Sequence, residues 1–177
     1  MPGKTWATAA MIAAVVLLAG CTPEPEPTPT PTGFASEAEA FAAAEETYRA
    51  YVEAGNQVDL SDPATFELML TWTTAAQSAK ERKELSELHA QGVSVSGLST
   101  IVAIEPASWD PATRIVKLAT CQDVSARDLK DSDGNSILAP DRPALHSDLV
   151  TFVLNPDSPT RLLIDEIGAP EVSACAG

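Results

Sequence analysis

The chain predicts an α+β fold in which a group of helices precedes an antiparallel sheet. Apolar residues recur at helical spacing between residues 36 and 91, as in amphipathic helices. From residue 93 the apolar period changes to two, and β-branched residues become frequent. Turn residues separate the strand-like segments at short intervals, which favours a meander of antiparallel strands. Residues 36–177 have the length of a single domain.

The first helix is predicted from its start and stop signals. Ser36 followed three residues later by Glu39 forms a capping box, in which both side chains bind backbone N–H groups at the helix start. Gly55 is the predicted end of the helix. The apolar face between these signals carries Phe41, Ala44, Tyr48 and Val52.

Two further helices follow. Asp62 before Pro63 predicts a short helix, because aspartate is a favoured N-cap and proline is tolerated at the first helical position. Thr74 with Gln77 forms another capping box for a third helix, which Gly92 should end. The apolar side of the short helix holds Phe66, Met69 and Leu70, and that of the third holds Ala75, Ala79, Leu85, Leu88 and His89, alongside the charged Lys80, Glu81, Lys83, Glu84 and Glu87.

Five strands are expected after these helices. Their predicted ranges are 93–96, 100–105, 113–125, 145–154 and 161–167. Trp109-Asp110-Pro111 and Asp133-Gly134-Asn135 supply turn chemistry between them. Asp131, Asp133 and Asn135 around Gly134 superficially resemble a calcium loop, but the loop's first and last ligand positions would then hold Leu129 and Pro140. A hairpin turn is the better interpretation.

The N-terminus has the pattern of an export signal. Lys4 precedes an apolar run at residues 6–18, which is too short for the roughly 20 residues that span a bilayer. Leu18-Ala19-Gly20-Cys21 then resembles the lipobox of bacterial lipoproteins, in which the cysteine is lipidated and becomes the new N-terminus. The resemblance implies a signal peptide at residues 1–20 and a lipid anchor on Cys21 at the extracytoplasmic face of the cell membrane. The alternatives are an ordinary signal peptide, with Cys21 as a free thiol, or an uncleaved anchor.

A stalk and an acidic domain follow Cys21. Residues 21–35 are rich in proline, threonine and glutamate, and the alternating prolines favour a semi-rigid polyproline II spacer of about 3.1 Å per residue. The chain has 11 basic and 25 acidic residues, and removing residues 1–20 takes away one of the basic ones. Nucleic acid is therefore an unfavourable partner. No sequence motif indicates a cofactor or a metal.

Cys121 and Cys175 form an even pair once Cys21 is assigned to lipid. Extracytoplasmic thiols are readily oxidised, so a disulfide between them is the natural interpretation. The alternative is a metal or redox site. It is disfavoured because neither cysteine lies in a Cys-x-x-Cys pattern and the chain has two histidines.

A family resemblance rests on four segments, none of which is a catalytic signature. They are Leu70-Thr71-Trp72-Thr73, Cys121-Gln122-Asp123-Val124-Ser125, Asp133-Gly134-Asn135-Ser136 and Asp141-Arg142-Pro143. Through them residues 41–175 resemble uncharacterised lipoproteins of Gram-positive bacteria with a nuclear transport factor 2-like domain. The resemblance implies helices packed on a curved antiparallel sheet, which forms a cone around the first helix and encloses a pocket. That shape serves isomerases, dehydratases, ligand binders and assembly modules alike.

Four residues are candidates for lining such a pocket. His146 and Asp148 lie two apart on one strand and share a face with Val150, so they could act as an acid–base pair. We expect instead a strand end that emerges into solvent. Trp72 is interpreted as a buried anchor and His89 as a hydrogen-bonded core or rim histidine. Trp109 is interpreted as a turn-packing residue.

These observations favour a lipid-anchored, non-catalytic module that binds a small ligand or another envelope protein. The absence of a nucleophile motif, a zinc signature and a phosphate loop in the sequence supports this interpretation. An isomerase-like or dehydratase-like enzyme that uses the cone pocket is the alternative. The sequence does not choose a ligand, a partner or an oligomeric state.

The lipobox resemblance predicts that Cys21→Ser abolishes lipidation. The variant lacks the thiol that would receive diacylglycerol, so it should not incorporate a palmitate analogue and should not be processed as a lipoprotein. Metabolic labelling of cells expressing either form measures the difference. Undiminished labelling of the variant would refute the assignment.

Overall fold

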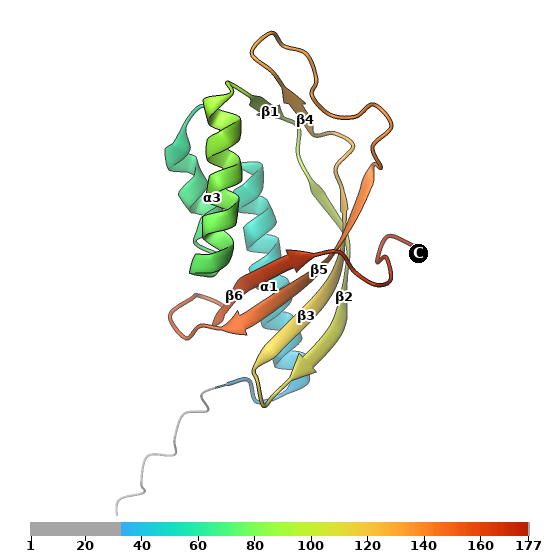
Figure 1. Cartoon of the computed structure of the whole chain (residues 1–177). Coiled ribbons are helices and arrows are strands. Elements are labelled where there is room, and N and C mark those ends of the chain that lie inside the picture. Colours follow the sequence, from blue (N-terminus) through green and yellow to red (C-terminus); the bar gives the residue numbers. More distant parts are fainter. Residues whose placement is uncertain (1–32, 177) are drawn as a thin grey trace, which may run out of the picture. The chain divides into compact units, whose positions relative to one another are not determined.

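Helices precede strands in the part of the chain that the computed structural model describes, residues 33–176, so the predicted α+β class is confirmed (Figure 1). The helical elements are α1 (Glu37–Asn56), the 3-10 turn η1 (Pro63–Thr65), α2 (Phe66–Leu70) and α3 (Ala75–Ala90). The strands are β1 (Ser94–Ser96), β2 (Thr100–Asp110), β3 (Ile115–Asp123), β4 (Asp128–Lys130), β5 (Leu145–Leu154) and β6 (Leu162–Gly168). The predicted signal peptide, Cys21 and most of the predicted stalk lie outside the described residues.

The main sheet is an antiparallel meander with the strand order β2-β3-β5-β6. The strand predicted at residues 93–96 is β1. It does not join the main sheet but pairs with β4 in a separate two-stranded ribbon. The prediction missed β4, whose three residues are too few to show a period of two. The predicted hairpin turn after β4 is present, with Lys130 bridged to Ser136 and the Asp131 N–H donating to the Asn135 carbonyl at 2.9 Å.

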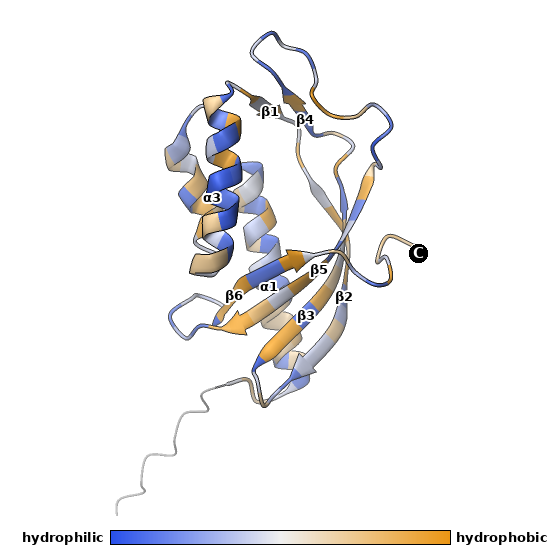
Figure 2. Ribbon diagram, in the orientation of Figure 1, coloured by the Kyte–Doolittle hydropathy of each residue, from blue (hydrophilic) through white to orange (hydrophobic). Residues whose placement is uncertain are grey.

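α1 lies across one face of the main sheet and forms the larger apolar cluster with it (Figure 1). Burial alternates along much of β3 and β5, as a sheet with one covered face requires. Both apolar and polar residues occur along these strands (Figure 2). The helix begins as predicted, with Ser36 Oγ accepting from the Glu39 N–H at 3.2 Å. Glu39 accepts from the Ala35 N–H at 2.7 Å, one residue before the donor of a standard capping box. Fully buried members of the cluster are Ala40, Ala44, Tyr48, Val116, Leu118, Val150, Phe152, Leu162 and Ile164.

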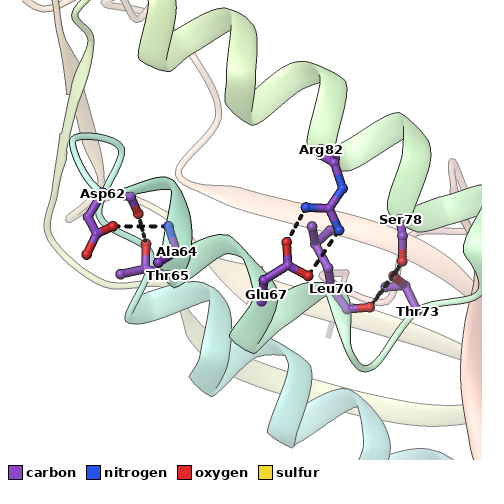
Figure 3. Close-up of polar contacts among 8 residues, drawn as sticks. All are labelled: Asp62, Ala64, Thr65, Glu67, Leu70, Thr73, Ser78 and Arg82. Atoms are coloured by element: carbon purple, nitrogen blue, oxygen red, sulfur yellow. Dashed lines mark hydrogen bonds and ion pairs between the residues drawn. The ribbon is translucent and has the colours of Figure 1, made fainter.

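α2 and α3 form a short hairpin of helices that is held by polar contacts (Figure 3). Asp62 caps η1 by accepting from the Ala64 N–H at 3.0 Å, as predicted for this N-cap. The Arg82 guanidinium of α3 binds the Glu67 carboxylate of α2 through both of its oxygens. A second apolar cluster forms beneath this hairpin, with the buried residues Val58, Leu60, Phe66, Leu70 and Val93.

The predicted apolar stripe of α3 is partly wrong. Ala75 and Ala79 are exposed, whereas Gln77 and Glu81 are buried. Leu85, one turn after Glu81, is half-buried and packs on the second cluster. The inward face of α3 therefore begins polar, because hydrogen bonds from Tyr51 of α1 and from Gln77 to Glu81 take the place of apolar packing there.

The start of α3 also closes one edge of the main sheet. The Ile164 N–H of β6 donates to the Trp72 carbonyl at 2.9 Å, and the Thr74 N–H donates to the Ile164 carbonyl at 2.8 Å. Thr74 Oγ1 donates to Asp165 at 3.0 Å while it caps α3. These bonds fix α3 on the same side of the sheet as α1 (Figure 1).

A disulfide joins Cys121 of β3 to Cys175 near the C-terminus. Thr120 faces α1, so its neighbour Cys121 points to the opposite face of the sheet. The Ala174 N–H donates to Ser147 Oγ of β5 at 2.9 Å beside the disulfide. The C-terminal segment is thereby fastened to the face of the sheet that the helices leave open.

Residues 33–176 lie within one compact unit and contain both apolar clusters, so this part carries its own core. Within it, no helix has the length and apolar character needed to cross a bilayer.

The disulfide predicts a large loss of stability for Cys175→Ser. The bond closes a loop across a sequence separation of 54 residues. In the chain-entropy model a loop of this size stabilises the fold by about 4 kcal/mol. The free energy of unfolding, measured by urea denaturation, should fall by most of that amount. Reductant should destabilise the wild type and leave the variant unchanged. Equal free energies of unfolding for the two proteins would show that the disulfide does not stabilise the fold.

Candidate functional site

A groove lies where the two apolar clusters separate, between α1, α3 and the β1–β4 ribbon. We call the part beside α1, of about 310 Å³, the inner part, and the part beside the β1–β4 ribbon, of about 250 Å³, the outer part. Val58, Leu85, Val124 and Arg127 line both parts, which makes the groove continuous. The inner part is at the lower end of the range for small-molecule sites, which begins at about 300 Å³, and the outer part alone is below that range.

The two parts of the groove differ in chemistry. The inner part has a polar side formed by Tyr51 of α1, Ser99, Gln122 of β3 and Arg127. The outer part is walled mainly by aliphatic side chains, namely Leu60, Leu88, Val95, Leu129 and Leu138 in addition to the shared residues. Arg142 also lines the outer part, but its guanidinium donates to the carbonyls of Val124 and Arg127 at 2.7 and 2.6 Å.

Beneath the inner part, Tyr48 of α1 is fully buried and carries a polar tip. Its hydroxyl accepts from Thr120 Oγ1 at 3.0 Å and from Gln122 Nε2 at 2.8 Å. Burial raises the pKa of Tyr48 to about 12, against the lowering effect of the Thr120 hydrogen bond. Tyr48 thus fixes the orientation of Gln122 at the groove.

Tyr51 links the groove to the buried carboxylate of Glu81. The Tyr51 hydroxyl donates to Glu81 Oε1 at 2.9 Å, and Gln77 Nε2 donates to the same oxygen at 2.9 Å. Glu81 Oε2 is buried and has no hydrogen-bond partner among the described residues. Burial raises the pKa of Glu81, and burial together with the nearby Glu81 charge also raises the pKa of Tyr51.

The structure corrects the interpretation of Asp148. His146 is exposed, but Asp148 is 8% exposed and lies on the helix-facing side of the sheet, opposite Thr120. The expectation of a strand end in solvent is therefore wrong for Asp148. His146 Nε2 lies 3.1 Å from Asp148 Oδ1, and burial raises the pKa of Asp148. Neither residue lines the groove, although Gln122, opposite His146 in the sheet, does.

The other sequence candidates also lie away from the groove walls. Trp72 is half-buried in the connection between α2 and α3. His89 is exposed, with Nδ1 at 2.6 Å from the Leu60 carbonyl oxygen. Trp109 packs against the larger apolar cluster at the end of β2. No three His, Cys, Asp or Glu side chains within residues 33–176 are grouped as metal ligands.

The sequence interpretation did not identify Tyr51, Glu81 or Arg127 as site residues. Tyr51 follows Tyr48 by three residues, so the two side chains share one side of α1, and their rings stack with centroids 6.5 Å apart. That spacing was a usable signal. The sequence held no such signal for Glu81 or Arg127, because an isolated charged residue is normally solvent-exposed.

No family model matches the chain, and no curated protein matches it. Among solved structures, the intermembrane-space region of the chloroplast protein ARC6 is similar, with a TM-score of 0.48 and 15% identity over 73% of this chain and 96% of that one. A periplasmic fragment of TraM is similar with a TM-score of 0.39 and 11% identity over 76% of this chain and 97% of that one. Likenesses at this level assign neither a fold family nor a function.

The buried carboxylate predicts a pH-dependent effect of Glu81→Gln. Because the pKa of Glu81 is raised in the folded state, its contribution to stability is complete below the unfolded value of about 4.3 and is lost as the pH rises through the folded pKa. Glutamine carries no charge, so the variant should gain about 1–3 kcal/mol over the wild type between pH 4 and pH 8. Urea denaturation across this range measures the difference.

Glu46→Gln is the matched control, because Glu46 is exposed on α1 and is not among the groups that shift the pKa of Glu81. Its free energy of unfolding should follow that of the wild type within about 0.5 kcal/mol at each pH. Parallel pH profiles for Glu81→Gln and the wild type would show that Glu81 is not a desolvated carboxylate.

Proposed function

We propose that the chain is an extracytoplasmic lipoprotein whose domain is a non-catalytic module that binds a small ligand in the groove. The single observation that carries the ligand-binding part is the groove itself, whose two parts share four lining residues and of which the inner part is the more polar. Ligand sites in proteins combine such apolar walls with a few converging polar groups. Anchoring through lipid on Cys21 is supported by the apolar run before Leu18-Ala19-Gly20-Cys21.

The nuclear transport factor 2-like cone is part of this proposal. A four-stranded antiparallel meander with α1 across its helix-facing side supports it. So does a groove that opens beside the C-terminal half of α1, since the resemblance implies a pocket enclosed by a sheet that curls around the first helix.

The position of the groove suits a tethered binder. The described chain enters α1 at Ser36, and Gly55, which lines the groove, lies 18 residues after the first residue of the helix. At 1.5 Å per residue this separates the two points by about 27 Å. Arg161 fixes the entry point by pairing with Glu39 and by donating to the Gly33 carbonyl at 3.3 Å. A lipid anchor on Cys21 would thus hold the domain by the end remote from the groove.

An isomerase-like or dehydratase-like enzyme is the second candidate, and one observation favours it. Asp148 is buried, its pKa is raised, and His146 lies in contact with it. A carboxylic acid so placed is suited to proton transfer. It ranks second because neither residue lines the groove in which a substrate would lie.

A neutral fluorescent probe tests the proposal. N-phenyl-1-naphthylamine should bind residues 22–177, which include the whole core, with an increase in fluorescence. Val124 lines both parts of the groove, so Val124→Trp should fill it and weaken binding at least tenfold. Val172→Trp adds the same bulk at a position that is 79% exposed and should leave binding unchanged.

Thermal unfolding of both variants verifies that they are folded. If the probe does not bind the wild type, or if it binds folded Val124→Trp as tightly, the groove is not a ligand site.

A further inference from the structure

The contacts of Arg127 differ from those of four other arginines. Arg49, Arg82 and Arg161 each pair with a glutamate, and Arg142 donates to two backbone carbonyls. Arg127 donates from Nη1 to Ser99 Oγ at 3.3 Å and forms no ion pair within residues 33–176. A guanidinium group offers five N–H donors, so most of its capacity to bind an anion is unused.

The surroundings of Arg127 make this lack of a counter-ion informative. The side chain is partly buried, and burial lowers its pKa. A cation withdrawn from water is costly unless an anion pairs with it. The chain has 25 acidic residues, and none of those described pairs with Arg127. The position therefore suits an anion that comes from outside the chain.

The groove restricts which anion fits. Arg127 lines both its polar inner part and its aliphatic outer part. Ser99 and Gln122 add a hydroxyl and an amide to the inner part, whereas Leu88, Leu129 and other aliphatic residues continue outward. A small inorganic anion would leave these aliphatic walls uncovered, and a neutral hydrocarbon would leave the guanidinium unpaired.

We propose that the groove binds a single-chain amphiphile whose anionic head, a carboxylate or a phosphate, pairs with Arg127 while its alkyl chain covers the aliphatic walls. This inference rests on the proposed ligand-binding function and names its ligand class. Guanidinium groups bind either head in a bidentate manner, so both heads share one recognition chemistry.

Displacement of N-phenyl-1-naphthylamine from residues 22–177 tests the ligand class. Dodecanoate, dodecyl phosphate and dodecanol present the same chain with a carboxylate, a phosphate or no charge. Each is titrated below the concentration at which it aggregates. We expect at least one of the two anions to displace the probe at a concentration tenfold or more below that of dodecanol, and the tighter anion identifies the head.

Variants at Arg127 separate charge from packing. Arg127→Gln should remove the preference for the anion over dodecanol, and thermal unfolding verifies that the variant is folded. Arg127→Lys should keep part of the preference. Arg49→Gln, which removes an exposed arginine from an i,i+4 pair, should behave as the wild type.

The outcomes distinguish this inference from the function on which it rests. Equal displacement by dodecanol and both anions, or an anion preference that survives Arg127→Gln, would overturn the ligand class while probe binding still supports a ligand site. Failure of the probe to bind would overturn both.

Discussion

The packing of α1 against the main sheet, above all against β3, is the constraint on which the rest of the structure depends. Tyr48 shows why, because its ring is fully buried in the larger apolar cluster while its hydroxyl accepts from Thr120 and Gln122. A Tyr ring can join an apolar core to a polar site only if its hydroxyl finds partners. Through this one side chain, the register between α1 and β3 also sets the position of Gln122. The core and the polar end of the groove are thus parts of the same packing arrangement.

Secondary structure could be predicted wherever local chemistry agreed with the final environment. Ser36, Asp62 and Thr74 all cap the helices that follow them, and β5 has its predicted bounds. Prediction failed where a tertiary contact decided the outcome. β1 has the composition of a meander strand but pairs with β4, which local pattern did not reveal. The same limit applies to the candidate site.

Buried polar groups are the part of the site that the sequence could not show. An interpretation based on the spacing of apolar residues places charged residues on the solvent-exposed surface. It therefore predicts that Glu81 is exposed, and it gives Arg127 no role. In the structure Glu81 is buried because Tyr51 and Gln77 both donate to it. Asp148 is likewise covered although it lies near the start of its strand. Such groups destabilise a fold unless they are satisfied, so their retention points to a function or to a specific packing role.

Burial has different consequences for the carboxylates and for Arg127. It raises the pKa of Glu81 and of Asp148 and so favours the neutral form of each. Arg127 lies at the groove, where no described carboxylate pairs with it and the guanidinium keeps its charge. No carboxylate among the described residues pairs with Arg127 in a chain that has 25 acidic residues, which is why we propose that its partner is an anion from outside the chain.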